Sequence, residues 1–120
     1  MLFIYVSLAK FDLVSIRLAV ACAQTGSLTA AARENHLALA AASRRIHELE
    51  SALDNTLFIR HTRGLLPTPA GRVFVKHGLA LLRTMEQIGF ELADLQQGIA
   101  RHISLFSSSA AITVSGGQFP

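Results

Sequence analysis

Cysteine is nearly absent from this sequence of 120 residues. Cys22 is the only one, so no disulfide can form within the chain and a reducing cytoplasm is the natural compartment. The residues around it, Val20, Ala21 and Ala23, are small and apolar. At such a position we expect a buried thiol rather than a nucleophile.

Long hydrophobic runs are also lacking. The apolar opening, residues 2–8, is too short to span a bilayer. It also lacks the basic leading region of a secretory signal. We therefore expect no membrane partner, and we interpret residues 1–10 as an apolar lead that is poorly ordered.

Motifs for catalysis or metal binding are missing as well. His47-Glu48 begins like the zinc-protease motif HExxH, but Ser51 stands where the second histidine is required. The remaining histidines show no metal-ligand spacing: His36, His61, His77 and His102. The sequence therefore predicts no enzyme, no cofactor and no metal site.

Acidic residues do not balance the basic ones. The net charge is +3, from 11 Lys and Arg against 8 Asp and Glu, and most of the cations lie between positions 33 and 76. Cations grouped in this way can neutralise phosphates and release counterions. A solvated basic face is the alternative.

Three short helices are predicted in the first half of the chain. They are expected at residues 13–24, at 28 or 29 to 35, and at 39–53. Asp12 can cap the first helix at its N-terminus, and Gly26 suits the left-handed position that ends it. Residues 36–38 form the turn between the second and third helices.

The third helix separates an apolar face from an outer face. Its apolar residues recur at helical spacing and must face the core: Ala42, Ile46, Leu49 and Leu53. The opposite side carries small and polar residues: Ala40, Ser43, Arg44, His47 and Ser51. A short helix, a tight turn and a helix with such a face can place that helix in the major groove of DNA.

A β-hairpin follows this pair of helices. Residues 57–60 and 65–68 are short strand-like runs on either side of residues 61–64, with Gly64 in the turn. Pro67 restricts the second run to an edge strand. Because a two-stranded hairpin is not stable alone, it must dock on the helices as a wing.

A long helix is predicted next. Thr68 can cap it, Pro69 suits its first turn, and no helix breaker occurs before Gly98. Its apolar residues fit alternating heptad positions, with Gly78 the one interruption: Phe74, Leu81, Met85, Ile88, Leu92 and Leu95. This stripe favours dimerisation, and therefore a homodimer, over packing against the chain's own domain.

The last residues change character. Residues 103–106 read as one strand, followed by a serine run and Gly116-Gly117. One strand cannot form a sheet, so we interpret residues 99–120 as the stub of a missing domain.

Five residues are the candidate DNA contacts. Arg44 is best placed to reach a guanine edge, the commonest specific contact of arginine. Ser43 and His47 can meet either a phosphate or a base edge, and Thr29 lies at a helix N-terminus suited to phosphate. Arg63, at the tip of the wing, can enter the adjacent minor groove.

Residues 11–98 resemble the N-terminal region of LysR-type transcriptional regulators. The matching motifs are GSLTxAA at 26–32, AxSRxIxxLE at 41–50, LFxR at 57–60 and LxTxxG at 66–71. The resemblance implies a winged helix-turn-helix, a linker helix that pairs two subunits, and a further domain that binds an inducer. It also implies DNA contacts by Ser43, Arg44 and Arg63.

Two departures from the family pattern stand out. Family members often carry polar residues and a proline at the positions occupied here by Ala38, Leu39 and Ala40. The loss of a glutamine-like contact at Leu39 leaves fewer groups that can read bases. Asp54 replaces a glycine that usually follows the recognition helix, so we expect backbone strain there.

The expected fold is mainly α, a winged helix-turn-helix followed by a long dimerisation (linker) helix. Its expected parts are a lead at 1–10, the DNA-binding domain at 11–68, the linker helix at 69–98 and the stub at 99–120. The expected function is that of a cytoplasmic, sequence-specific regulator that binds double-stranded DNA. Most of its inducer-binding domain, and with it the inducer site, would be absent.

Two alternatives stay open. The chain could act through its long helix as an interaction fragment that pairs with full-length regulators. It could also belong to another winged-helix family, such as the molybdate-responsive regulators.

Overall fold

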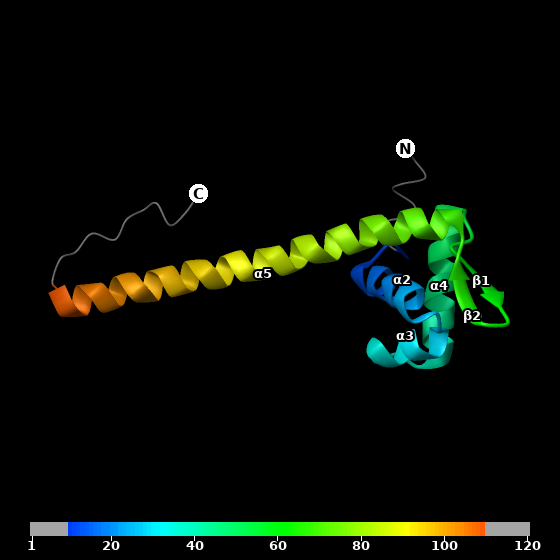
Figure 1. The fold of residues 1–120 in the computed structure, drawn as a ribbon, viewed down its shortest axis with the longest axis horizontal. Coiled ribbons are helices and arrows are strands. Elements are labelled where there is room, and N and C mark those ends of the chain that lie inside the picture. Colours follow the sequence, from blue (N-terminus) through cyan, green and yellow to red (C-terminus); the bar gives the residue numbers. More distant parts are fainter. Residues whose placement is uncertain (1–9, 110–120) are drawn as a thin grey trace. The chain divides into compact units, whose positions relative to one another are not determined.

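Five helices and strands precede one long helix in the computed structural model, which describes residues 10–109 (Figure 1). The elements are α2 (Leu13–Thr25), α3 (Leu28–Glu34), α4 (Leu39–Leu53), β1 (Phe58–His61), β2 (Gly64–Pro67) and α5 (Pro69–Ser109). They confirm the predicted fold class. The chain divides into two compact units, and the boundary between them lies after Leu82. Most of the expected lead, residues 1–9, and residues 110–120 of the expected stub lie outside the described residues.

Both predicted caps of α2 are present. The Asp12 carboxylate accepts a hydrogen bond from the Ser15 backbone N–H at 2.8 Å. At the other end Gly26 has φ 67°, and its N–H donates to the carbonyl of Cys22. A left-handed residue at this point closes the last turn, which is why the helix ends there.

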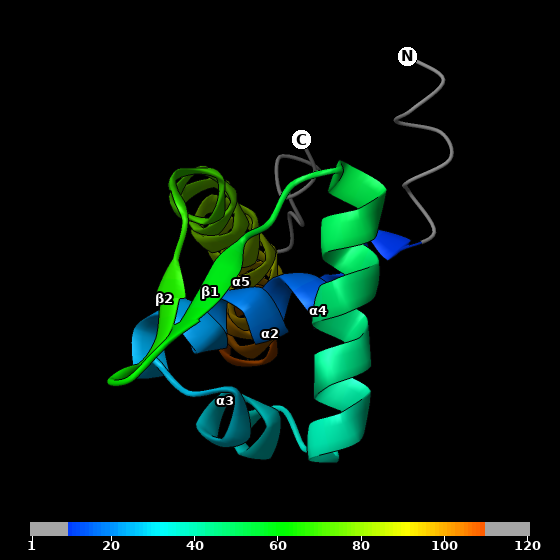
Figure 2. The same ribbon diagram turned by 90° about the vertical axis from the view of Figure 1, so that its right-hand side faces the viewer.

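Helix α2 lies at the centre of the domain. Its buried residues surround the helix rather than forming one stripe: Ser15, Ile16, Leu18, Ala19, Val20, Ala21 and Cys22. Helices α3 and α4 and strand β2 all contact it (Figure 2). Burial raises the pKa of the Cys22 thiol to about 11, as the loss of hydration disfavours the thiolate.

Helix α4 has the two faces that the spacing predicts. Ala42, Ile46 and Leu49 are buried, and Leu53 is partly buried against them. The helix ends at Asp54, which has φ 52° and ψ 42°. This left-handed conformation at a residue with a Cβ confirms the strain expected from the missing glycine.

Strands β1 and β2 form the antiparallel hairpin, with Phe58 opposite Pro67 and His61 opposite Gly64. Both strands are four residues long. The wing docks through its backbone and its side chains, because the Leu65 N–H donates to the carbonyl of Gly26 at 2.9 Å and Phe58 is buried in the core. Gly64 has φ 124°, and a Cβ there would lie 2.4 Å from the Gly26 carbonyl oxygen. This close approach requires glycine.

Glu50 joins α4 to the wing, a role that its place in the sequence motif does not reveal. Its Oε2 accepts hydrogen bonds from the backbone N–H groups of Leu57, at 2.7 Å, and Phe58, at 3.2 Å. The carboxylate therefore fixes the start of the wing relative to the last turns of α4.

Helix α5 begins as predicted and continues further than predicted. Thr68 caps it, because its hydroxyl accepts from the Gly71 N–H at 3.0 Å and donates to the Thr56 carbonyl. The helix extends through Gly98 to Ser109. The prediction of a strand at 103–106 is therefore wrong, as is the expected end of the helix at residue 98. One interior glycine costs a helix only about 1 kcal/mol, and a single strand has no partner for its backbone.

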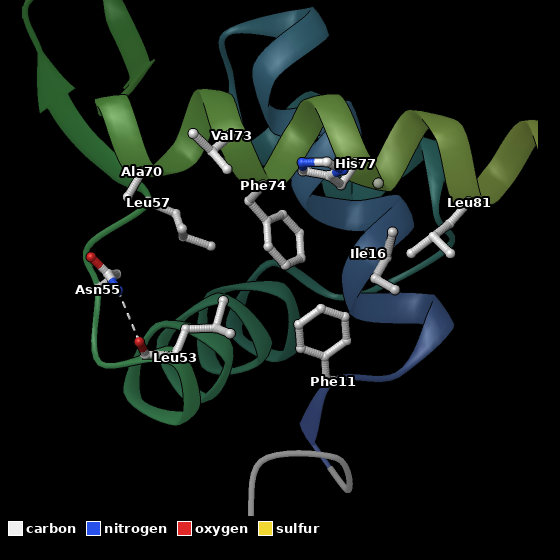
Figure 3. Close-up of a pocket in the computed structure, with 11 residues that line it drawn as sticks. Phe11, Ile16, Leu53, Asn55, Leu57, Ala70, Val73, Phe74, His77 and Leu81 are labelled. Carbon is white, nitrogen blue, oxygen red and sulfur yellow. Dashed lines mark hydrogen bonds between the residues drawn. The ribbon is translucent and has the colours of Figure 1, made fainter. Parts of the chain in front are cut away.

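The first turns of α5 border an apolar cavity of about 460 Å³ (Figure 3). Phe74 points into it from α5 and meets the ring of Phe11, with ring centroids 5.5 Å apart. Val73, His77 and Leu81 line the same cavity. Phe74 thus packs on the core of its own domain, in contrast to its expected place in the dimerisation stripe.

Gly78 allows α5 to approach α2 closely. A Cβ at this position would lie 3.2 Å from side-chain atoms of both Ile16 and Val20. The interruption of the heptad pattern at Gly78 therefore has a packing reason.

Candidate nucleic-acid interface

A groove of about 1000 Å³ lies between the helix-turn-helix and the wing. The start of α3 and the start of α4 form one side, and the wing forms the other. Its lining residues are Thr25, Gly26, Ser27, Leu28, Thr29, Leu39, Ala40, Ser43, Arg60, His61, Thr62, Arg63, Gly64 and Leu65. None of them lines the apolar cavity beside α5.

The structure brings three of the five predicted DNA contacts to this groove: Thr29, Ser43 and Arg63. Arg44 and His47 instead line a shallower depression beside it, together with Lys10 and Ser51. Ala40 and Ser43 line both, so the two hollows form one continuous surface along the outer face of α4. The predicted residues therefore share a surface although they come from three elements.

The predicted contacts are accessible. Thr29, Arg44, His47 and Arg63 are exposed, and Ser43 is partly exposed. The backbone beneath Thr29 is fixed, since the Ser27 hydroxyl accepts from the Ala30 N–H at 3.1 Å and so caps α3. A fixed backbone with exposed side chains suits recognition of a rigid partner.

The groove is basic. Arg60, His61 and Arg63 lie along its wing side, and no carboxylate is among its lining residues. In the depression, Glu48 lies 4.0 Å from the Lys10 ammonium. Arg60 and His61 were not among the predicted contacts, although their position in a wing beside Arg63 is the signal that could have identified them.

Arg45, which follows Arg44 on α4, has a structural role. Its guanidinium lies 3.1 Å from the Asp12 carboxylate. Partial burial acts to raise the pKa of Asp12, but hydrogen bonds from Ser15 and Arg45 outweigh it and hold this pKa below its ordinary value. The pair ties the start of α2 to α4, so two of the domain's helices hold the outer face in place.

Residues 10–109 show no group of three or more His, Cys, Asp or Glu side chains that could hold a metal ion. Over the same part of the chain, no helix combines the length and apolar character needed to cross a membrane.

These elements define a winged helix-turn-helix domain: a short capped helix, a turn, a second helix with an open outer face, and a hairpin beside it. The family model of the bacterial regulatory helix-turn-helix proteins of the lysR family matches residues 13–72. The chain belongs to this family, as its motifs predicted.

Curated relatives are named as regulatory proteins or transcriptional regulators. The nitrogen assimilation regulatory protein nac of Escherichia coli (strain K12) is 38% identical over 80 residues, which are 67% of this chain and 26% of that protein. An uncharacterized HTH-type transcriptional regulator from the ibpB-leuC intergenic region of Azotobacter vinelandii is 33% identical over 97 residues, which are 81% of this chain and 67% of that protein. The chain thus spans about a quarter of the length of the first relative.

Solved structures of DNA complexes share the fold. The DNA-binding domain of BenM in complex with benA site 1 DNA has a TM-score of 0.64 and 30% identity, covering 69% of this chain and 96% of that one. The CbnR DNA-binding domain in complex with DNA has a TM-score of 0.62 and 26% identity, covering 74% of this chain and 98% of that one.

Proposed function

We propose that the chain binds double-stranded DNA in a sequence-specific manner and thereby regulates transcription, without catalysing a reaction. The observation that carries the proposal is the basic groove between α3, α4 and the wing, continuous with the outer face of α4. The DNA complexes of the related domains support it. Its place of action is the cytoplasm, where bacterial DNA lies.

In this proposal the outer face of α4 enters the major groove. Residues near the start of a recognition helix contact base edges, and Arg44 meets guanine there while Ser43 and His47 contact base edges or phosphates. Thr29 contacts a phosphate at the start of α3. Arg63 reaches from the wing into the minor groove, with Arg60 against the backbone phosphates.

The test begins with a preferred duplex selected by the protein from DNA with a random central segment. Affinity is then measured by fluorescence anisotropy for wild type and for Arg44→Ala. Loss of a bidentate contact costs about 1–3 kcal/mol, so Arg44→Ala should bind the preferred duplex about 5- to 150-fold more weakly. On a scrambled duplex the loss should be smaller.

Arg83→Ala is the matched control, because it removes the same charge from an exposed position on α5 that lines neither hollow. It should change affinity less than about twofold. Wild-type affinity of Arg44→Ala for the preferred duplex would refute the proposal.

The proposed DNA-binding form is a homodimer paired through α5. Leu81, Met85, Ile88 and Leu92 are each about half exposed, at 48%, 47%, 54% and 56%, and Leu95 is partly exposed. Their spacing places these residues in one row along the helix. A row of half-exposed apolar side chains is stabilised when a second copy covers it.

Sedimentation of the full chain at micromolar concentration tests the dimer. Leu92→Glu places a charge in the row and should produce monomers, whereas Gln97→Glu, which adds the same charge at an exposed position off the row, should sediment as a dimer. Monomeric wild type would contradict both the homodimer and the alternative in which α5 pairs this chain with full-length regulators.

A further inference from the structure

An exposed apolar segment opens the recognition helix. Ala38, Leu39 and Ala40 are all exposed, and Leu39, the first residue of α4, is 50% exposed. Ala38 supplies no side-chain cap to the helix. The segment therefore brings apolar side chains, and no polar side chain, to a position where the side chains of a recognition helix meet bases.

Leu39 faces the groove rather than the core. It lines the groove with Ala40 and, one turn further along α4, Ser43. The core residues of the same helix, Ala42 and Ile46, are buried on its other side. The Leu39 side chain thus lies on the surface that the proposed function places against DNA.

The major groove exposes one large apolar group, the C5 methyl of thymine. The other groups that the bases present there are hydrogen-bond donors and acceptors, and a leucine placed against them would desolvate polar atoms without replacing their hydrogen bonds. An apolar side chain at this position therefore favours thymine over cytosine at one base pair.

We propose that Leu39, flanked by Ala40, reads the 5-methyl group of a thymine in each half-site. The inference rests on the proposed function and deepens it, since it names the chemical group that this part of α4 recognises. Leu39 is thus a specificity-determining residue. Its contact replaces the glutamine-like contact that the chain lacks at this position.

Deoxyuridine provides a direct probe, since it differs from thymidine only by the absence of that methyl group. Each thymine of the selected duplex is replaced in turn, and affinity is measured by fluorescence anisotropy with the full chain. Burial of one methyl group corresponds to about fourfold in affinity. One position in each half-site should therefore show a loss of about fourfold with wild type.

The protein variants assign that loss to Leu39. With Leu39→Ala, and with Leu39→Gln, which keeps a side chain of similar length but ends in an amide, the same deoxyuridine substitution should change affinity less than about 1.5-fold. Leu66→Ala removes an equally large, exposed side chain that does not line the groove, and it should retain the wild-type loss.

The outcomes distinguish a failure of the proposed function from a failure of the proposed role of Leu39. If no duplex is preferred, or if Arg44→Ala binds like wild type, the proposed function itself fails. If the preferred duplex depends on Arg44 but no deoxyuridine weakens wild-type binding, the role of Leu39 is overturned. The same holds if wild type and both Leu39 variants lose affinity equally at the same thymine.

Discussion

Removal of the Glu50 carboxylate should destabilise the domain by about 3 kcal/mol, because each hydrogen bond to a charged acceptor is worth about 1.5–3 kcal/mol. Glu50 accepts two such bonds from the Leu57 and Phe58 backbone N–H groups, at 2.7 and 3.2 Å. The second lies at the long end of the usual range and contributes less. The Glu50 side chain is only 16% exposed, so water replaces the lost acceptor poorly.

Urea denaturation of Glu50→Ala and Glu50→Gln measures this effect. Glutamine keeps an oxygen acceptor but loses the charge, so we expect a destabilisation of about 1 kcal/mol for Glu50→Gln. Glu48→Ala is the control on the same helix, because Glu48 makes only an exposed ion pair with Lys10 and its loss should cost less than about 0.5 kcal/mol. If Glu50→Ala is no less stable than Glu48→Ala, the hydrogen bonds that Glu50 accepts do not hold the wing against α4.

Three further predictions concern the backbone and the buried thiol. Gly71→Ala should destabilise the domain by at least about 2 kcal/mol in urea denaturation, because its Cβ would lie 2.0 Å from the Leu57 carbonyl oxygen, and an unchanged midpoint would contradict that close approach. Asp54→Gly should stabilise it by about 1 kcal/mol in the same assay, since glycine adopts the left-handed conformation without strain, and a loss of stability would show that Asp54 is not strained. The raised pKa of Cys22, about 11 against an ordinary value of 9.0, means that the unfolded chain loses this proton first as the pH rises. The contribution of Cys22 to the free energy of unfolding is therefore complete below pH 9 and decreases by about 2 kcal/mol as the pH approaches 11. In urea denaturation across this pH range, a Cys22→Ala variant should lack this part of the pH dependence.

Local signals allowed the helix-turn-helix to be predicted closely. Capping residues, apolar spacing and turn glycines lie within a few positions of the backbone that they specify, as Asp12 and Gly26 show. The predicted bounds of α4 agree with the structure, whereas the strain at Asp54 was expected from the family pattern and not from a local signal. The same local signals placed the wing to within about a residue.

Contacts between distant segments escaped the sequence analysis. Three contacts depend on the tertiary arrangement: the two backbone hydrogen bonds that Glu50 accepts, the ion pair of Arg45 with Asp12, and the packing of Gly78 on α2. Phe74 fits a heptad pattern, yet it packs on Phe11 because the start of α5 covers its own domain. Periodicity alone does not tell which face a long helix gives to its own core.

At the candidate site, too, features set by local spacing were predicted, and features set by the tertiary arrangement were not. Sequence spacing predicted the outer face of α4, but it did not place Arg60 and His61 in the groove. The family pattern marked Leu39 as a missing polar contact, whereas its exposure in the groove supports the proposed contact with thymine.

Amide hydrogen exchange of the full chain, with and without the selected duplex, tests the central claim most directly, because it maps the DNA-binding surface without any mutation. Binding through the groove and the outer face of α4 should slow exchange at residues 27–31, 39–47 and 60–64. If DNA binds but exchange at those residues stays unchanged, the groove between α3, α4 and the wing is not the DNA-binding surface.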